Sequence, residues 1–369
     1  SVTITAGNTS GSFQIDFLED GLDEDDENLV VSLGTITNGD AGTPSSVTFT
    51  IADDDLGRTG PGGVGGAGIQ SELATWLDAR ALEDTYSNND QLNGSTSGWL
   101  DQSAYNAHAT NSGASTGPVF RTNQINGQPA IEFDGGGSDE LVSTPSTGTA
   151  LTAFVVANSD VSSRVGIWEH HSGSSNRGGL FLDGNNLDFY DGSTERKVSN
   201  NYTQGDNVIV TTIHDGSTQL GYENGTEVLN ETNARSKPSQ DQLVVGDDQS
   251  GGDEHNGLIA EYLLFDGRLS ETERNIIENY LSAKYAISIA NDRYAGDNSG
   301  NGDYDNDVVG IGQTSASDLH EAAEGGNLVL ERNSGFDNGD YLFAGHNGLG
   351  GETTSDITTT GASALKART

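Results

Sequence analysis

The chain has 369 residues, of which 56 are acidic and 16 basic, so its formal net charge is −40. This charge excludes nucleic acid as a partner, because phosphate binding needs clustered Lys and Arg, and it disfavours docking on anionic lipid. There is no Cys and hence no disulfide framework. No apolar run approaches the roughly 20 residues of a membrane span, so no membrane insertion is predicted. The acidity favours either solvation in high salt or binding of hard cations such as calcium.

Residues 1–56 predict strands, because apolar side chains alternate with polar ones in three segments, 12–17, 29–33 and 47–51. An acidic run, 19–27, separates the first two segments, and the third ends in an Asp triplet, 53–55. The first five residues already have a strand-like pattern, so we expect the natural N-terminus upstream. In residues 57–68, seven of twelve positions are Gly, which predicts a linker without regular structure.

Residues 69–290 predict a long β region with turns at Asp-Gly and Asn-Gly pairs. The predicted strands are 130–133, 151–157, 165–169, 180–182, 208–213, 242–245 and 258–265. Many short strands with regular turns favour a sandwich or jelly roll. A weak helix is predicted over 70–81, with Leu73, Trp76 and Leu77 on one face. A second helix is predicted over 270–285, where Ser270 and Glu273 form a capping box. Residues 291–369 predict a Gly- and Asp-rich tail with short strands near 328–331 and 341–344, as the start of a further module.

Residues 12–55 resemble the second half of a Calx-β domain. The resemblance is carried by the strand 12–17, by Glu24 and Glu27 ahead of the segment LVVSL, and by the closing strand with its Asp triplet. It implies an Ig-like sandwich that binds calcium at one end. The implied ligands are Asp20, Glu24, Glu27, Asp53, Asp54 and Asp55. The first strands of the family pattern are absent, so they either precede residue 1 or are donated by another chain.

Residues 69–349 resemble a laminin-G-like (concanavalin-like) jelly roll. The resemblance is carried by the segments WLDQS (99–103), INGQPAIEFDG (125–135), IAEYLLF (259–265) and YLSAKY (280–285). This combination is similar to modules of large secreted bacterial surface proteins. It implies the fold more than a function, because this jelly roll serves lectins, peptide binders, spacers and some enzymes.

A second candidate cation site lies in the tail. Asp303, Asp305 and Asp307 alternate with Tyr304 and Asn306 and could direct oxygens to one calcium ion. The segment lacks the terminal Glu of an EF-hand, and an ordinary acidic loop is the alternative.

One local cluster suggests ligand binding. His170 and His171 follow Trp168 and Glu169, and a metal site there would need a third ligand that the spacing does not identify. Trp168, His170 and Tyr190 could instead offer flat faces and polar edges to a sugar. The plainer interpretation is a strand end entering a Ser/Gly loop.

The sequence therefore predicts an all-β protein: a partial Calx-β sandwich (1–56), a Gly-rich linker (57–68), a jelly roll (69–290) with one or two short helices, and a β tail. We expect a calcium-associated, extracellular adhesion segment that presents the jelly roll to a glycan or a surface protein. The first alternative is a structural subunit of a fibre that self-associates by strand donation. The second is a polysaccharide-active enzyme, although there is no Cys nucleophile, no H-E-x-x-H motif and no P-loop.

Overall fold

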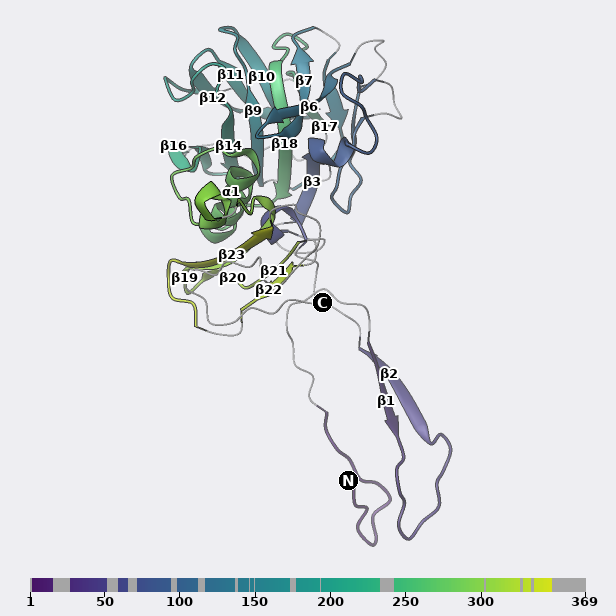
Figure 1. The fold of residues 1–369 in the computed structure, drawn as a ribbon. Coiled ribbons are helices and arrows are strands. Elements are labelled where there is room, and N and C mark those ends of the chain that lie inside the picture. Colours follow the sequence, from purple (N-terminus) through teal and green to yellow (C-terminus); the bar gives the residue numbers. More distant parts are fainter. Residues whose placement is uncertain are drawn as a thin grey trace. The chain divides into compact units, whose positions relative to one another are not determined.

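The computed structural model describes most of the chain (Figure 1). The described residues are 2–15, 27–51, 59–65, 72–93, 98–111, 117–136, 139–145, 147–148, 150–172, 177–192, 194–232, 242–301, 303–325, 328–332 and 335–346. The chain divides into two compact units, Ser1–Leu56 and Gly57–Thr369.

The first unit contains one antiparallel hairpin, β1 (Glu27–Ser32) with β2 (Ser46–Ile51). These strands confirm two of the three predicted segments. The predicted strand 12–17 is not found over 12–15, which have no regular structure, and 16–17 lie outside the described residues. The hairpin is not half-buried as the alternation predicts, because the side chains of Val30, Val47 and Phe49 are 56%, 46% and 52% exposed. An isolated two-stranded hairpin is marginally stable in water.

The second unit is built on two eight-stranded antiparallel sheets. We call them the outer sheet and the middle sheet, because the middle sheet has the outer sheet on one face and a helix on the other. The outer sheet contains, in spatial order, β13 (Thr194–Val198), β12 (Asn186–Asp191), β11 (Arg177–Asp183), β10 (Arg164–His171), β17 (Gln242–Val245), β8 (Leu141–Ser143), β5 (Ala109–Thr110) and β4 (Gly98–Trp99). The middle sheet contains β16 (Thr226–Glu231), β15 (Gln219–Glu223), β14 (Val208–His214), β9 (Leu151–Asn158), β18 (Asn256–Asp266), β7 (Gln128–Asp134) and β6 (Val119–Ile125), and β3 (Glu72–Asp78) pairs with β18. All seven predicted strands of the region 69–290 are confirmed.

The main core lies between the two sheets. Side chains alternate along each strand, so every second residue points into this space. The largest of the fully buried side chains there include Trp99, Phe120, Phe133, Trp168 and Tyr262. This core explains how a chain with only 32% hydrophobic residues folds, because its apolar residues are concentrated on the inner faces.

A second core lies between the middle sheet and helix α1 (Glu271–Tyr285). The helix begins at Ser270 with the predicted capping box, in which the Ser270 side chain accepts from the Glu273 backbone N–H. Ile276 and Leu281 of the helix pack with Phe154 and Phe265 of the sheet. The predicted helix over 270–285 is therefore confirmed.

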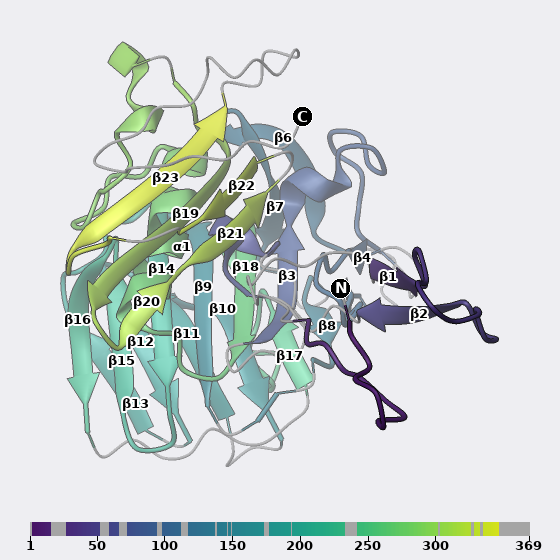
Figure 2. The same ribbon diagram turned by 90° about the horizontal axis from the view of Figure 1, so that it is seen from below.

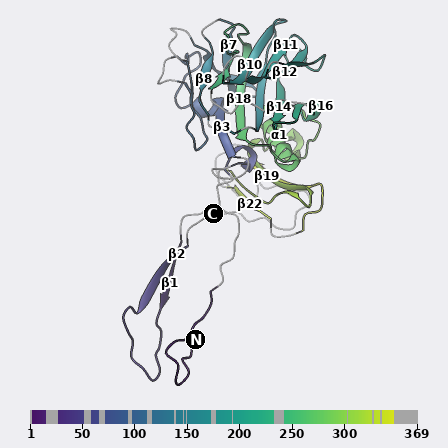
Figure 3. The same cartoon turned by 180° about the vertical axis from the view of Figure 1, so that it is seen from behind.

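The region beyond α1 adds a third layer (Figures 1 and 3). Its sheet has the order β20 (Asp318–His320), β19 (Asn306–Ser315) and β23 (Asp340–His346), and a separate hairpin joins β21 (Ala322–Gly325) to β22 (Leu328–Glu331). Seen from below, these strands lie in front of α1 (Figure 2). The strands predicted near 328–331 and 341–344 are confirmed. The 3₁₀ helices Ala295–Asp297 and Ser299–Asn301 precede β19.

The predicted helix over 70–81 is wrong. Residues Glu72–Asp78 form β3, and a 3₁₀ helix follows over Ala79–Leu82. β3 pairs with the second half of β18, with a bulge opposite Leu264 and Phe265. The bulge turns both Leu73 and Trp76 toward α1, so their three-residue spacing imitates a helix. The unpaired edge of β18 needs a partner strand, and this tertiary requirement outweighs the local pattern.

The glycine-rich segment is not simply an unstructured linker. Pro61–Gly63 forms a buried 3₁₀ turn, and the described residues 60–65 are all buried. A Cβ added at Gly63, where φ is +80°, would lie 2.4 Å from Ala323 Cβ. Glycine is needed here for close packing against the third layer, because any side chain would separate the two segments. Among the described residues, no helix is long and apolar enough to cross a membrane.

Candidate functional site

The predicted ligand-binding residues of β10 lie on two faces of the outer sheet, Trp168 and His170 on one and His171 on the other. Trp168 and His170 point inward, where they are 2% and 0% exposed, and their rings meet edge to face with centroids 6.0 Å apart. Their cross-strand partners in β17, Val245 and Leu243, belong to the same core. The prediction that Trp168 and His170 face a sugar is therefore wrong, because the pleat of the sheet turns them into the core.

His171 and Tyr190 lie apart from this core, beside an arginine network. Arg177 lies over the Tyr190 ring, 4.4 Å from its centroid, and donates to the Tyr190 hydroxyl at 3.0 Å. The same guanidinium pairs with Glu169 at 3.4 Å and Asp248 at 3.2 Å. Arg177 therefore already has an aromatic face and two carboxylates, which leaves it little capacity for a ligand.

A second arginine repeats this arrangement on the same sheet. Arg164 lies 3.6 Å from the centroid of Phe181 and pairs with Asp188 at 3.0 Å and with Asp253. Burial raises the pKa of Glu169 to about 7 and that of Asp188 to about 7, since the low dielectric disfavours the charged carboxylate. Burial also lowers the pKa of His171, and the nearby Arg177 lowers it further. Both arginines are paired within the network, which links β10, β11 and β12 to the loop between β17 and β18.

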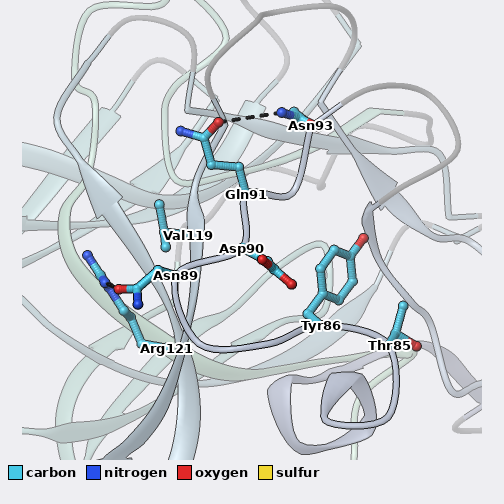
Figure 4. A pocket seen from close by; sticks show the side chains of 8 residues that line it. All are labelled: Thr85, Tyr86, Asn89, Asp90, Gln91, Asn93, Val119 and Arg121. Atoms are coloured by element: carbon cyan, nitrogen blue, oxygen red, sulfur yellow. Dashed lines mark hydrogen bonds between the residues drawn. The ribbon is translucent and has the colours of Figure 1, made fainter.

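A polar groove at the β6 edge of the middle sheet is a stronger candidate. It consists of two hollows that share Gln91, Val119 and Arg121. The first hollow, with a volume of about 630 Å³, is drawn in Figure 4 and is lined by Thr85, Tyr86, Asn89, Asp90, Gln91, Asn93, Val119 and Arg121. The second, of about 480 Å³, is lined by Gln91, Gly117, Val119, Arg121, Glu132, Phe133, Asp134, Gly136, Asp139 and Asn256. We refer to the two together as the groove.

The backbone of the groove is fixed to β6. Asn89 N–H donates to the Phe120 carbonyl at 2.9 Å, Phe120 N–H donates to the Asp90 carbonyl at 2.8 Å, and Gln91 forms a bridge with Val119. The side chain of Leu92 is fully buried in the main core and anchors residues 89–92 there. Residues 89–92 thus behave as a short extra strand, and the exposed side chains of this segment are carried on a rigid backbone.

One aromatic ring and one carboxylate mark the first hollow (Figure 4). The half-buried Tyr86 ring packs on Phe120 with centroids 6.2 Å apart, and its hydroxyl contacts the Gly98 carbonyl at 3.4 Å. Asp90 accepts from the Ser87 N–H at 2.7 Å, which fixes the turn that follows Tyr86. The amides of Asn89, Gln91 and Asn93 supply further donors and acceptors.

Arg121 stands where the two hollows meet. Its Nε donates to Glu132 at 2.6 Å, and its Nη1 donates to the Asn89 side chain. The side chain is 30% exposed. The register of β6 and β7 places Glu132 opposite Val119, two residues before Arg121 on β6. The sheet therefore sets the position of this ion pair.

The second hollow is acidic. Asp139 is 5% exposed and accepts from the Asp134 backbone N–H at 2.9 Å. Burial, together with a side-chain hydrogen bond with Asp134, raises the pKa of Asp139 to about 6. At the wall, Gly117 is required by packing, because a Cβ there would lie 2.3 Å from the Leu92 carbonyl.

The structure does not bring Asp303, Asp305 and Asp307 together as a cation site. Asp307 pairs with Arg80 at 3.0 Å and with His346 at 2.8 Å, and Asp305 accepts from Asn126. Over the part of the chain that is described, no group of three or more His, Asp or Glu side chains could hold a metal ion. Whether the chain binds calcium stays a prediction.

Most of the candidate calcium ligands of the first unit cannot be placed. The predicted ligands Asp20, Glu24, Asp53, Asp54 and Asp55 lie outside the described residues, and Glu27 is the first residue of β1.

The groove was not predicted from the sequence. A signal for it exists in the segment YSNNDQLN (86–93), which carries four amides and one carboxylate around a single buried Leu. Such a segment is usually interpreted as a polar loop. Only the pairing with β6 shows that it is a rigid wall.

No family model and no curated protein sequence matches the chain. Among solved structures, it is similar to domain 4 of AbnA, a GH43 extracellular arabinanase from Geobacillus stearothermophilus, in complex with arabinotriose. The identity is 14%, the match covers 57% of this chain and 98% of that chain, and the TM-score is 0.41. It is also similar to Trypanosoma rangeli sialidase in complex with the inhibitor DANA. The identity is 12%, the match covers 56% of this chain and 32% of that chain, and the TM-score is 0.40. A third similar structure is the binding domain of botulinum neurotoxin serotype D. The identity is 16%, the match covers 55% of this chain and 52% of that chain, and the TM-score is 0.38. Likeness at these values carries no argument about ligand or activity, and the β-sandwich is established by the chain's own two sheets.

Proposed function

We propose that the unit Gly57–Thr369 is a glycan-binding domain and that the groove is its binding site. The observation that carries this proposal is the combination of amides, a carboxylate and a tyrosine ring around one hollow. Sugar hydroxyls both donate and accept hydrogen bonds, and so do Asn and Gln side chains. The Tyr86 ring can cover the apolar C–H face of a sugar while Asp90 accepts from its hydroxyls.

The fixed backbone supports this proposal. Binding costs conformational freedom, and a site on rigid elements has less freedom to lose. The wall 89–92 is held by β6, and Arg121 is held by Glu132 and Asn89. A flexible polar loop would lack this advantage.

We propose binding rather than catalysis. Most glycoside hydrolases use two carboxyl groups that flank the bond to be cleaved. In the first hollow Asp90 is the one carboxylate among the lining residues. The three carboxyl groups of the second hollow are already engaged, Glu132 with Arg121 and Asp139 with Asp134, which supports a binding role. The test is incubation of the protein with each bound glycan, followed by measurement of new reducing ends. Turnover that is lost in an Asp90→Ala variant would overturn this part of the proposal.

The binding site itself is tested with a glycan array followed by calorimetry on the strongest ligand. Asp90→Ala should weaken binding by about tenfold or more, since a lost hydrogen bond to a charged group costs roughly 1.5–3 kcal/mol. Gln91→Ala should weaken it by about two- to tenfold, since a lost neutral hydrogen bond costs roughly 0.5–1.5 kcal/mol. The control is Gln124→Ala, an exposed Gln on the same strand β6 but outside the groove. Equal affinities in all three variants, with unchanged melting temperatures, would place the ligand elsewhere.

The wider setting is also a proposal. The acidity and the two resemblances support an extracellular surface protein in which this domain contributes to adhesion. A second candidate function, self-association into a fibre, is favoured by the exposed Val30, Val47 and Phe49 of the β1–β2 hairpin. Sedimentation over a range of calcium and salt concentrations tests it, and a chain that remains monomeric throughout would exclude it.

A further inference from the structure

We infer that the ligand of the groove is an uncharged oligosaccharide of several units, which lies in both hollows and crosses Arg121. This inference rests on the proposed function and adds the length and the charge class of the ligand. It follows from three observations, which concern the size of the groove, its continuity and its charge.

The first observation is size. The hollows have volumes of about 630 and 480 Å³. Each lies within the roughly 300–1,000 Å³ that holds a drug-sized ligand. A single sugar ring is smaller than such a ligand, so one ring would leave most of the groove filled with water. A chain of rings uses the whole lined surface.

The second observation is continuity. Gln91, Val119 and Arg121 line both hollows, so the two hollows adjoin at these side chains and one extended ligand can contact both. Glu132 and Asn89 hold Arg121 in one position where the two hollows adjoin. Its side chain keeps 30% exposure, which is sufficient for contact with a sugar hydroxyl.

The third observation is charge. The groove contains four carboxyl groups, those of Asp90, Glu132, Asp134 and Asp139, and one cation, Arg121. Glu132 already neutralises the arginine, so a uronate unit would meet carboxylates without a cation to pair with. The net charge of −40 adds long-range repulsion of any polyanion. A neutral sugar incurs neither cost.

The length of the ligand is tested by calorimetry on the full chain with a series of one to six units of the neutral glycan found by the array. The affinity should rise by about tenfold or more between the shortest ligand that binds and the longest. Gly136→Gln introduces a side chain into the second hollow and should reduce the affinity for long ligands to that for short ones, while short ligands bind as before. Affinity that does not depend on length in the unsubstituted protein would overturn the inference about length.

The charge class is tested with a uronate oligosaccharide of matched linkage and length. It should bind at least about tenfold more weakly than the neutral chain, and Asp134→Asn should narrow this difference because it removes one carboxylate. Equal binding of the two ligands would overturn the inference about charge. If no oligosaccharide binds at any length, the proposed function itself fails and this inference fails with it. If short ligands bind as tightly as long ones, only the inference fails.

Discussion

A buried lysine provides the sharpest test of how helix α1 is held on the middle sheet. Lys284, on α1, is 2% exposed in its side chain and lies 2.7 Å from Asp78 on β3 and 2.7 Å from Glu261 on β18. Glu261 also accepts from Trp76 at 2.8 Å and from Tyr285 at 2.9 Å. One cation therefore compensates two buried carboxylates from two strands of the middle sheet.

Replacement of Lys284 by Met preserves the length of the side chain but removes its charge. Asp78 retains Arg80, whose guanidinium is 3.7 Å away, whereas Glu261 keeps only neutral donors. Loss of one partner from a buried ion pair costs about 3–5 kcal/mol, because the other charge remains buried and uncompensated. We therefore expect the free energy of unfolding to fall by about 3–5 kcal/mol, a large part of the 5–15 kcal/mol typical of a domain.

The measurement is urea unfolding followed by tryptophan fluorescence at pH 8. The matched control is Lys197→Met, because Lys197 pairs with Asp183 but is 39% exposed, and exposed pairs contribute about 0–1 kcal/mol. The double variant Lys284→Met, Glu261→Gln should recover part of the loss, since it removes the uncompensated charge. Equal losses for the two lysine variants, or no recovery in the double variant, would refute the electrostatic explanation.

Three other predictions concern pH, packing and calcium. Burial raises the pKa of Glu169 to about 7. The contribution of this group to stability is therefore complete below its unfolded pKa and is lost as the pH rises through about 7. The free energy of unfolding, measured between pH 5 and 8, should fall less steeply with pH in Glu169→Gln than in the unsubstituted protein. Gly63→Ala should lower the melting temperature more than Gly335→Ala, because both positions have positive φ but only Gly63 packs against Ala323. Equal losses of melting temperature would show that only the backbone conformation matters. We expect calcium to raise the melting temperature of the full chain at fixed ionic strength, with the same rise in an Asp303→Asn, Asp305→Asn double variant; a rise abolished by these substitutions would place the ion in the tail.

Local patterns in the sequence located helix α1 and several of the central strands. Apolar patterns located the hairpin β1–β2 of the first unit and strands such as β9 and β18 of the second, and the capping box at Ser270 located the start of α1. These features depend on neighbours in the chain, because the pleat fixes a period of two and the first turn of a helix needs a local acceptor. The all-β class therefore follows from the sequence alone.

Tertiary contacts decided the rest. The edge of β18 makes a strand of Glu72–Asp78, although the spacing of Leu73 and Trp76 is that of a helix. The bulge between Gly166 and Trp168 in β10 places consecutive residues in the core, so no simple alternation assigns Trp168 and His170 to the inside. Pro61–Gly63 is buried because residues far along the chain pack on it, Ile276 of α1 beside Gly62 and Ala323 beside Gly63.

The candidate site shows the same division. The residue types of the segment 86–93 are visible in the sequence, but a polar loop and a binding wall have the same composition. Backbone hydrogen bonds to β6 make the wall rigid, and the β6–β7 register places Glu132 beside Arg121. The sequence alone determined the all-β class, the start of α1 and the acidity of this protein, because these are properties of neighbouring residues and of composition. The groove was decided by the tertiary structure, because its two walls come from segments that meet only when the sheet forms.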